Sequence, residues 1–312
     1  MAESPTVCCI VLTCGLHPDG RVKKLLLDTL DSVTNMTYPN FNVIVVDNGS
    51  IDGSQDAVRA AYPGMKLIEN GENLGFMKGS NVGLRYALEQ KADWALLLNN
   101  DISVDPQMLS EMMKVAVADD TVGIVAPKIY FFSEPNKIWY GGGSINYFTG
   151  IIKHLGLREE DHGQYDQTVE TGYITGCAIL IRRQVMEKIG LLDPIYSPMY
   201  SEDADFSVRA SNAGYKLMYV PKAKLWHKVS SFTGGGLTPV KTRLKVEHNL
   251  IFFKRYARWY HWLTIPICIG FMTLLFVVKE LFKGNFAIVG ALASGIGKSI
   301  LSLGKRVDST PA

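Results

Sequence analysis

The sequence predicts an α/β fold in which a mostly parallel central sheet is flanked by helices. Short apolar runs rich in β-branched residues alternate along the chain with segments whose apolar residues recur three or four positions apart. Strands that alternate with helices in this way form parallel sheets joined by helical crossovers. In addition, 47% of the 312 residues are hydrophobic, which supplies a large core and excludes global disorder.

The alternation is clearest in the first part of the chain. The strands expected there lie at residues 7–12, 41–46, 66–69 and 94–98, and the helices at residues 22–34, 54–61, 78–90 and 106–118. The strands are apolar and buried, whereas the first helix carries its apolar residues on one face. Asp105 as N-cap and Pro106 at the first helical position mark the beginning of the fourth helix.

The second half is less regular. The strands expected there lie at residues 178–181 and 216–220, and the helices at residues 185–189 and 203–213. Gly214 ends a helix, because glycine adopts the left-handed conformation that follows many helices. Pro221 ends the last strand, because proline has no N–H group to donate to a neighbouring strand. Three consecutive glycines at 141–143 mark a turn.

Charge and cysteine content narrow the class of protein. The formal net charge is only +2 and the sequence has no nucleic-acid-binding motif, so a nucleic acid is not an expected partner. The five cysteines are an odd number without zinc-type spacing, which argues against a disulfide scaffold and fits a reducing compartment. No basic region precedes the first short apolar stretch, so no signal peptide is expected.

Two acidic residues follow predicted strands, at the edge where open α/β sheets bind ligands. Asp47 follows the strand at 41–46, and Asp101 follows the strand at 94–98. Asp101 suits a hard divalent cation such as Mg²⁺ or Mn²⁺, which takes oxygen ligands and shares them with substrate phosphates. The Asp47 carboxylate is suited to accept a hydrogen bond from an N–H group of a nucleotide base. For either residue alone, an ordinary turn or helix cap is the alternative.

Three further segments suit the same site. Residues 73–81 lead into a helix, whose free N–H groups favour a phosphate or a sugar hydroxyl. Asp203, at an acidic helix start, suits a general base that takes a proton from a hydroxyl group. His227 suits a second metal ligand beside Asp101. The alternatives are helix capping, favourable charge at a helix N-terminus, and a structural histidine.

Six segments in chain order resemble those of a known family. They are residues 45–54 (VVDNGSIDGS), 72–76 (ENLGF), 96–101 (LLLNND), 175–178 (TGCA), 202–209 (EDADFSVR) and 226–227 (WH). The ordered set resembles glycosyltransferase family 2, the inverting enzymes of the GT-A fold, and is most similar to the rhamnosyltransferase-like branch. The resemblance implies a Rossmann-like central sheet and a hexosyltransferase, which moves one sugar from a nucleotide-diphosphate donor to a hydroxyl group of a glycan acceptor.

The resemblance also implies roles for individual residues. Asp203 is implied as the catalytic base, and Asp101 and His227 as the ligands of Mg²⁺ or Mn²⁺. The residues expected in the nucleotide-sugar pocket are Thr13, Asp47, Asn48, Asn73, Gly75, Lys78, Asn81, Asn99 and Asn100. The candidates for the acceptor site are Gly176, Cys177 and Glu202.

The chain departs from the family pattern at two places. Asn99 stands at the first position of the usual acidic metal motif, so a single carboxylate is expected to hold the cation together with the donor diphosphate. Cys14 and Gly15 replace the usual Tyr-Asn after Thr13. The Gln-x-x-Arg-Trp motif of processive synthases is absent from the sequence, which favours transfer of one sugar per encounter.

The C-terminal segment differs in composition from the rest. An aromatic and basic stretch at residues 252–262 precedes an uncharged run at 263–278 and an apolar segment at 286–303. Basic residues and Trp or Tyr beside an apolar run are typical of a membrane interface. Helices that lie in the membrane surface are favoured over a single span, and a buried or dimerisation helix is the alternative.

These observations predict a division of the chain and a location. The catalytic domain is expected at residues 1–250, with a nucleotide-sugar half to about residue 125 and an acceptor half after it, and the membrane-association segment at residues 251–312. The expected location is the cytoplasmic face of the plasma membrane, with a lipid-linked acceptor in cell-surface polysaccharide biosynthesis. The sequence does not decide whether the chain forms a homodimer.

The sequence does not decide the identity of the donor, and two other classes of protein remain as alternatives. dTDP-rhamnose is the favoured donor and a UDP-sugar is next. A sugar-nucleotide pyrophosphorylase has a related fold, but its Gly-rich, Arg-containing first loop does not match residues 15–21. A catalytically silent nucleotide-binding scaffold would not need Asp203.

Overall fold

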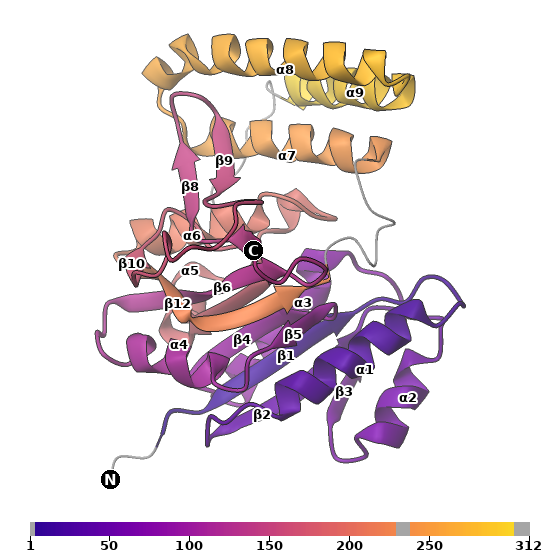
Figure 1. Ribbon diagram of the computed structural model, residues 1–312, viewed down its shortest axis with the longest axis vertical. Helices are drawn as coiled ribbons and strands as arrows, with labels where there is room; N and C mark the ends of the chain where they lie inside the picture. Colours follow the sequence, from indigo (N-terminus) through magenta and orange to yellow (C-terminus); the bar gives the residue numbers. More distant parts are fainter. Residues whose placement is uncertain (1–3, 229–237, 303–312) are drawn as a thin grey trace.

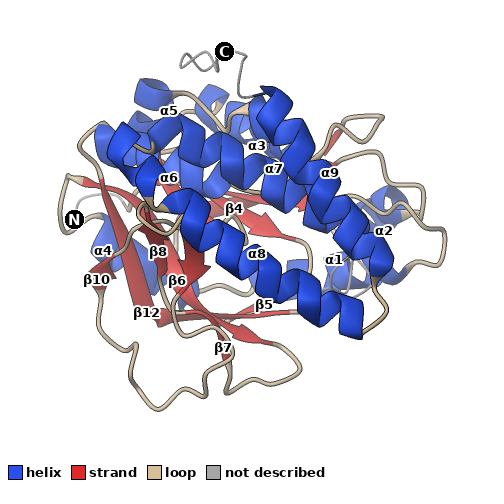
Figure 2. Cartoon of the chain, turned by 90° about the horizontal axis from the view of Figure 1, so that it is seen from above, coloured by secondary structure: helices blue, strands red, loops and turns tan. Residues whose placement is uncertain are grey.

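The computed structural model describes residues 4–228 and 238–302. Within these residues, ten strands form one central sheet, two more form a hairpin, and helices flank the sheet (Figures 1 and 2). The strands of the sheet are β1 (Val7–Thr13), β2 (Phe41–Asp47), β3 (Lys66–Glu69), β4 (Trp94–Asn99), β5 (Ile102–Val104), β6 (Val122–Phe131), β7 (Ile138–Tyr140), β10 (Val169–Glu170), β11 (Ala178–Arg182) and β12 (Lys216–His227). The hairpin consists of β8 (Gly143–Asn146) and β9 (Ile151–His154).

The helices expected up to residue 213 occur in the predicted order, whereas the helix at residues 239–256 had not been predicted. The helices are α1 (Arg21–Thr34), α2 (Ser54–Ala61), α3 (Phe76–Glu89), α4 (Met108–Ala116), α5 (Arg183–Ile189), α6 (Glu202–Asn212), α7 (Pro239–Tyr256), α8 (Ile265–Phe282) and α9 (Phe286–Ser302), with 3₁₀ turns η1 (Pro194–Tyr196) and η2 (Trp259–Leu263). α3 lies very close to β1, because a Cβ at Gly83 would collide with the side chain of Ile10. The seven residues of β1 are all buried, as expected for a central strand.

The sheet combines a parallel half with a mixed half. The strand order is β10-β12-β6-β11-β4-β1-β2-β3. β1 pairs in parallel with β2 and β4, and β2 pairs in parallel with β3, which confirms the parallel arrangement predicted for the first half. β11 runs antiparallel between β4 and β6, whereas β12 is parallel to β6. The second half is therefore mixed, because β11 enters the sheet from the opposite direction.

Two predicted boundaries were wrong. Pro221 does not end its strand, because β12 continues to His227 and the pairing with β6 shifts between Val220 and Lys224. Proline is tolerated at such an irregularity, where no ladder hydrogen bond is required of it. The fourth helix begins at Met108 rather than at Pro106, and Asp105 accepts a hydrogen bond from the Gln107 N–H in the turn before it.

A separate helical layer lies above the sheet. Figure 1 shows α7, α8 and α9 stacked there, with the β8–β9 hairpin reaching up beside them. The tip of this hairpin is attached to the layer, because Thr264 Oγ1 donates to the Phe148 carbonyl oxygen at 2.6 Å. The Asn249 amide donates to the Gly150 carbonyl oxygen at 3.2 Å. The hairpin therefore connects the upper helices with the sheet below them.

Candidate active site

The predicted site residues gather at one edge of the sheet. Thr13 at the end of β1 is paired in register with Asp47 at the end of β2, and Leu12 is paired with Asn99 at the end of β4. The antiparallel β11 begins at this edge, because Ala178 is paired with Leu98. Carboxyl ends of neighbouring parallel strands are the usual ligand site of open α/β sheets.

Asp47 has one carboxylate oxygen free for a ligand. Its side chain is 1% exposed, and Oδ2 accepts hydrogen bonds from the Ser50 N–H at 3.2 Å and from Gln55 Nε2 at 2.9 Å. Oδ1 is buried without a partner in the part of the chain that the structure describes. A buried carboxylate oxygen without a hydrogen bond is unfavourable, so a ligand N–H donor is expected there.

Asn48 and Asn73 shape the loop that leads into α3. Asn48 Oδ1 accepts from the Asn70 side chain at 3.0 Å and from the Leu74 N–H at 3.2 Å, while its Nδ2 donates to Asn73 Oδ1 at 3.0 Å. Gly75, with φ of 80°, ends this loop and precedes the first turn of α3. The loop therefore holds the N-terminus of α3 next to the end of β2.

Lys78 and Asn81 both lie inside α3, in agreement with the helix expected at residues 78–90. Lys78 is exposed in the first turns of the helix. The Asn81 side chain instead donates to the Leu192 carbonyl oxygen at 2.8 Å and accepts from the Leu192 N–H at 3.0 Å. Both ends of the Asn81 amide are therefore occupied by the backbone of Leu192, and Asn81 is not part of the proposed donor site.

Gly15 and Cys14, which depart from the family pattern, lie beside the turn that follows β2, and Cys14 Sγ donates to the Asn48 carbonyl oxygen at 3.1 Å. The Gly15 N–H donates to Ser50 Oγ at 2.8 Å, and a Cβ at Gly15 would collide with the Asp52 carboxylate. Asp52 in turn accepts from the backbone N–H groups of Lys23 and Ser54. Glycine is therefore needed where the first strand ends, because the Asp52 carboxylate occupies the space of a side chain.

Asp101 and His227 are brought together by strand pairing. β5 pairs antiparallel with β12 and places His227 opposite Ile102, so the side chain of Asp101 meets that of His227. Asp101 Oδ1 lies 3.1 Å from His227 Nε2, and both residues are buried. Burial lowers the pKa of His227, but the neighbouring Cys177 and Asp101 outweigh burial and raise it to about 10. A cation that binds this pair has to displace the proton.

The separation of the two side chains is that of an ordinary hydrogen bond and is also compatible with two neighbouring ligands of a divalent metal ion. Adjacent ligands of an octahedral ion with bonds of about 2.1 Å lie roughly 3 Å apart, and the observed separation is 3.1 Å. Among the described residues, no group of three or more His, Cys, Asp and Glu side chains forms a complete metal site. Mg²⁺ commonly binds through one or two carboxylates plus substrate phosphates, which agrees with an incomplete protein ligand set.

Asp203 lies at the beginning of α6 in a position suited to a base. Its Oδ2 accepts from the Gly176 N–H at 3.2 Å and its Oδ1 from the Ala204 N–H at 2.8 Å. Burial raises the pKa of Asp203. The preceding Tyr200 and Ser201 have φ angles of 83° and 68°, an uncommon conformation for residues other than glycine that is often found at functional sites.

The three corners of the candidate site are Asp47, the Asp101–His227 pair and Asp203, and contacts connect them. Asn100 Nδ2 donates to Thr13 Oγ1 at 2.8 Å, beside the Asp47 corner, and the Asn99 N–H donates to the Cys177 carbonyl oxygen at 3.1 Å. Cys177 neighbours His227 and follows Gly176, which holds Asp203. Glu202, next to Asp203, is buried, and its Oε2 has no partner among the described residues. Burial, followed by the Asp203 charge, raises the pKa of Glu202 well above its usual value.

A cluster of aromatic rings beside Asp101 and His227 was not predicted. The Trp139 ring packs edge-on against His227 with centroids 4.7 Å apart, and against His154 with centroids 4.5 Å apart. Burial lowers the pKa of His154 to about 4, so the ring is neutral at neutral pH. In the sequence, Trp139 and Tyr140 directly precede the three glycines at 141–143. The glycines had been interpreted only as a turn, and the two aromatic residues had not been considered.

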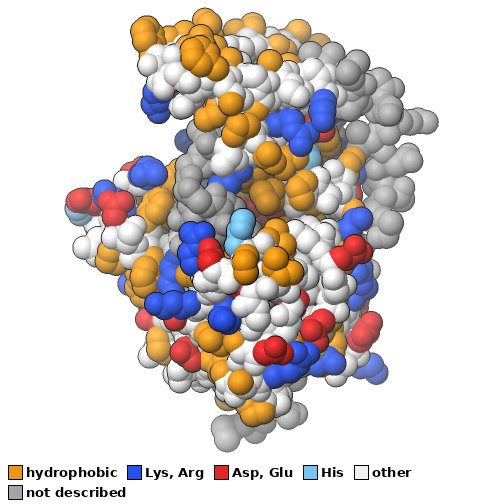
Figure 3. All heavy atoms as spheres, turned by 90° about the vertical axis from the view of Figure 1, so that its right-hand side faces the viewer, with side chains coloured by type: hydrophobic (Ala, Val, Ile, Leu, Met, Phe, Trp, Pro, Cys, Tyr) orange, Lys and Arg blue, Asp and Glu red, His pale blue; other side chains and the backbone are white. Residues whose placement is uncertain are grey.

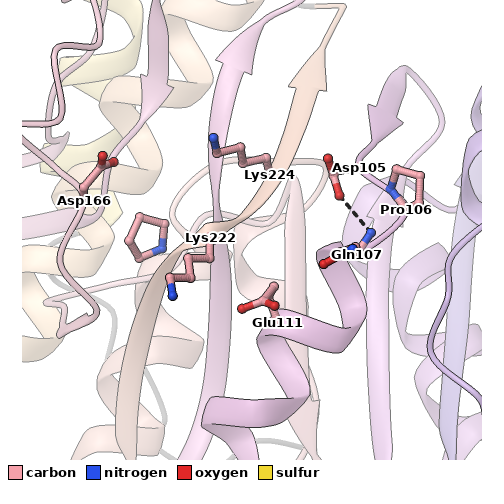
Figure 4. Close-up of a pocket in the computed structure, with 8 residues that line it drawn as sticks. Asp105, Pro106, Gln107, Glu111, Asp166, Lys222 and Lys224 are labelled. Carbon is pink, nitrogen blue, oxygen red and sulfur yellow. Dashed lines mark hydrogen bonds between the residues drawn. The ribbon is translucent and has the colours of Figure 1, made fainter.

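The depression in Figure 4 lies elsewhere. It has a volume of about 570 Å³ and is lined by acidic and basic side chains together, among them Asp105, Glu111, Lys222 and Lys224. None of the predicted site residues lines it. It is therefore separate from the site at the strand ends.

The fold and the position of the site define a GT-A glycosyltransferase architecture. The chain is similar to the mannosyltransferase PcManGT from Pyrobaculum calidifontis, solved with GDP-Man and Mn²⁺, with a TM-score of 0.60 and 16% identity over 96% of this chain and 88% of that one. It is also similar to S. aureus TarS 1-349, solved with UDP-GlcNAc, with a TM-score of 0.61 and 15% identity over 97% of this chain and 83% of that one. These likenesses confirm the predicted fold.

Residues 20–190, more than half of the chain, match the profile of glycosyl transferase family 2, and the chain belongs to this family. It is 27% identical to the N-acetylglucosaminyl-diphospho-decaprenol L-rhamnosyltransferase of Mycobacterium tuberculosis over 66% of this chain and 72% of that protein. It is 26% identical to the dTDP-rhamnosyl transferase RfbF of Shigella flexneri over 63% of each. The predicted family and enzyme class are confirmed: the chain is a glycosyltransferase.

Proposed function

We propose that this enzyme is an inverting, metal-dependent transferase that moves one sugar from a nucleoside-diphosphate donor to a hydroxyl group of a glycan acceptor. The observation that carries the proposal is the placement of the Asp101–His227 pair and of Asp203 at one sheet edge, connected through Cys177 and Gly176. The favoured donor is dTDP-rhamnose, because two similar proteins are named for rhamnose transfer, and a UDP-sugar is next.

Each corner has a part in the proposed reaction. The free Asp47 Oδ1 accepts an N–H of the nucleotide base, and the loop at Asn73 and Gly75 lies beside it. Asp101 and His227 hold Mg²⁺ or Mn²⁺, which supplies the positive charge that stabilises the departing diphosphate. Asp203 takes the proton of the acceptor hydroxyl, while the N–H groups of Gly176 and Ala204 fix the direction of its carboxylate.

A panel of nucleotide sugars tests this proposal. The full chain is incubated with dTDP-rhamnose, UDP-sugars and GDP-sugars, with Mn²⁺ or with a chelator. Release of the nucleoside diphosphate is measured as donor hydrolysis, in which water takes the place of the glycan acceptor and receives the sugar. Release from one donor class that requires the cation is the expected result. No release from any donor, or release that is equal in the chelator, would contradict the proposal.

The pH dependence of the reaction follows from the raised pKa of Asp203. The base must be deprotonated, so kcat/KM is expected to fall as the pH drops through the pKa of Asp203. Because burial raises this pKa, the acidic limb should lie above the ordinary aspartate value of 3.8. A pH–rate profile at saturating Mn²⁺ measures the limb. A profile that stays flat down to the ordinary aspartate value would exclude Asp203 as the base.

The division of the chain is part of the proposal. Residues 1–250 contain the catalytic site, and residues 251–312 form the membrane-association segment; the border lies within α7, so this helix belongs to both parts. The proposed location is the cytoplasmic face of the plasma membrane, where a lipid-linked glycan serves as the acceptor in cell-surface polysaccharide biosynthesis.

The surface of α8 supports membrane attachment. Within the described residues, α8 is the one helix long and apolar enough to cross a membrane, and only 11% of it is buried. Ile267, Phe271, Leu274 and Val278 recur at helical spacing and are 43–72% exposed, so they form one apolar face. Figure 3 shows hydrophobic side chains along the top of the molecule, where this layer lies. A helix with an open apolar face beside Trp259 and basic residues suits the surface of a bilayer.

Negative charges introduced on this apolar face of α8 are expected to weaken the binding of the protein to lipid vesicles. The double variant Ile267→Glu/Phe271→Glu is expected to bind phosphatidylglycerol vesicles at least tenfold less than the unchanged chain, because each large apolar side chain contributes about 1.5–3 kcal/mol when buried. The control is Val117→Glu, whose side chain is also exposed but lies at the end of α4 in the catalytic body. Cosedimentation measures binding, and equal binding of all three proteins would contradict attachment through α8.

A further inference from the structure

The turn between β2 and α2 fixes the direction of the Asp47 carboxylate. Oδ2 accepts hydrogen bonds from the Ser50 N–H at 3.2 Å and from Gln55 Nε2 at 2.9 Å. Gln55 Nε2 also donates to the Ser50 carbonyl oxygen at 2.8 Å. Because both partners of Nε2 are acceptors, this end of the Gln55 side chain is its NH₂ group. A carboxylate oxygen has two acceptor sites, and two protein N–H groups use both sites of Oδ2.

The backbone that carries Gln55 is held in place by other hydrogen bonds. The Ile51 N–H donates to the Gly15 carbonyl oxygen at 2.8 Å, which connects the turn with the end of β1. Asp52 Oδ1 accepts from the Ser54 N–H at 3.1 Å and from Ser54 Oγ at 2.5 Å, at the first residue of α2. Gln55 follows directly as the second residue of this helix. Its side chain is therefore presented from a fixed turn.

The other oxygen of Asp47 is left for a ligand. Oδ1 is buried, and no residue in the described part of the chain donates a hydrogen bond to it. A buried carboxylate oxygen without a donor is unfavourable, so the ligand has to supply an N–H group. Because Ser50 and Gln55 use Oδ2, Asp47 offers a nucleotide base one acceptor atom instead of two.

The bases differ in the number of N–H groups that they present along one edge. Thymine and uracil have a single ring N–H between two carbonyl oxygens. Guanine has a ring N–H and an amino group side by side, and these two donors match the two oxygens of a free carboxylate. When one carboxylate oxygen is already used, the single N–H of thymine or uracil is still satisfied, whereas one of the two guanine donors is not. An unsatisfied donor in a buried pocket is unfavourable, so the occupied Oδ2 disfavours guanine.

We propose that Gln55 is a specificity-determining residue: by occupying Asp47 Oδ2, it makes the donor pocket select thymidine and uridine diphosphates over guanosine diphosphate. The inference rests on the proposed function and deepens it, because it names the residue that decides the class of donor nucleotide. Gln55 lies outside the six segments that carry the family resemblance. It acts through Asp47 and takes no part in the transfer step.

Calorimetric titration of the full chain with dTDP, UDP and GDP in the presence of Mn²⁺ tests this inference. The unchanged chain is expected to bind dTDP and UDP more tightly than GDP. Gln55→Leu, which keeps the size of the side chain but removes its donor, should reduce this preference about tenfold, the effect of one hydrogen bond to a charged group. Gln55→Lys keeps an N–H donor for Oδ2 and should keep the preference, because its added charge acts on all three diphosphates alike. The control Gln90→Leu removes an amide from an exposed position at the end of α3 and should also keep it.

The ratio of affinities separates specificity from a general effect on the pocket. If Gln55→Leu weakened the binding of all three nucleotides by the same factor, Gln55 would only support the turn, and the inference would be overturned. GDP binding to the unchanged chain as tightly as dTDP and UDP would overturn it as well, and so would an equal loss of preference in Gln55→Lys and Gln55→Leu. Failure of the proposed function is distinct, because the unchanged chain would then bind none of the three nucleotides.

Discussion

Replacing Asp203 with Asn is expected to lower the rate of sugar transfer about a hundred- to ten-thousandfold, the usual contribution of a general base. The amide keeps the shape of the side chain and still accepts one backbone hydrogen bond, but it does not take the proton of the acceptor hydroxyl. Binding of the donor should stay close to that of the unchanged enzyme, because the Asp47 and Asp101 corners do not involve Asp203. Single-turnover transfer and titration of the nucleotide measure the two effects.

A matched control variant distinguishes the loss of a negative charge from the loss of the catalytic base. Asp56→Asn removes the same charge from an exposed side chain on α2 and should leave both transfer and donor binding unchanged. If Asp203→Asn turned over at the rate of the unchanged enzyme, the base would have to be another group. If donor binding fell together with turnover, Asp203 would instead support the donor pocket.

Replacing Asp205 with Asn is expected to lower the free energy of unfolding by about 3–5 kcal/mol, the cost of leaving buried charges unpaired. The Asp205 side chain is fully buried between α6 and α7. It accepts hydrogen bonds from two arginines and two tyrosines, which are Arg209 Nε at 2.8 Å, Arg255 Nη1 at 2.8 Å, Tyr196 Oη at 3.2 Å and Tyr256 Oη at 2.6 Å. The amide leaves both guanidinium groups without their shared carboxylate, because Asp193 compensates only for Arg255.

Urea denaturation of the full chain measures this effect. The control is Asp120→Asn, because Asp120 pairs with Arg182 from a fully exposed position and its removal should leave the midpoint unchanged. A midpoint for Asp205→Asn equal to that of the control would show that the network between α6 and α7 does not stabilise the fold. Since α6 begins at Glu202, the same network also keeps Asp203 in place.

The strands and first helices were predictable because their signals are local. Each buried strand is a short apolar run, and the helix expected at residues 54–61 matches α2 (Ser54–Ala61). Pro221 misled the prediction because a proline ends regular pairing but not a strand that contains a bulge. The mixed direction of the second half was not predictable, because the direction of β11 depends on its neighbours in space.

The site was predictable where a functional residue follows a strand. Asp47 and Asp101 were recognised by that position, and the structure places both at the same sheet edge. The resemblance predicted that His227 lies beside Asp101, but a local pattern alone does not, because their contact spans 126 residues and arises from the pairing of β5 with β12.

The most direct test of the central claim is a calorimetric titration of the full chain with the donor nucleotide identified in the panel, with Mn²⁺ and with a chelator. The account predicts that Mn²⁺ strengthens binding to the unchanged chain, and that Asp101→Asn, which removes the one carboxylate of the metal pair, abolishes this gain. Asp166→Asn, a charge removed from a side chain 62% exposed in the catalytic body, should retain the gain. Equal binding with and without Mn²⁺, or a full gain in Asp101→Asn, would contradict a metal-dependent donor site at Asp101 and His227.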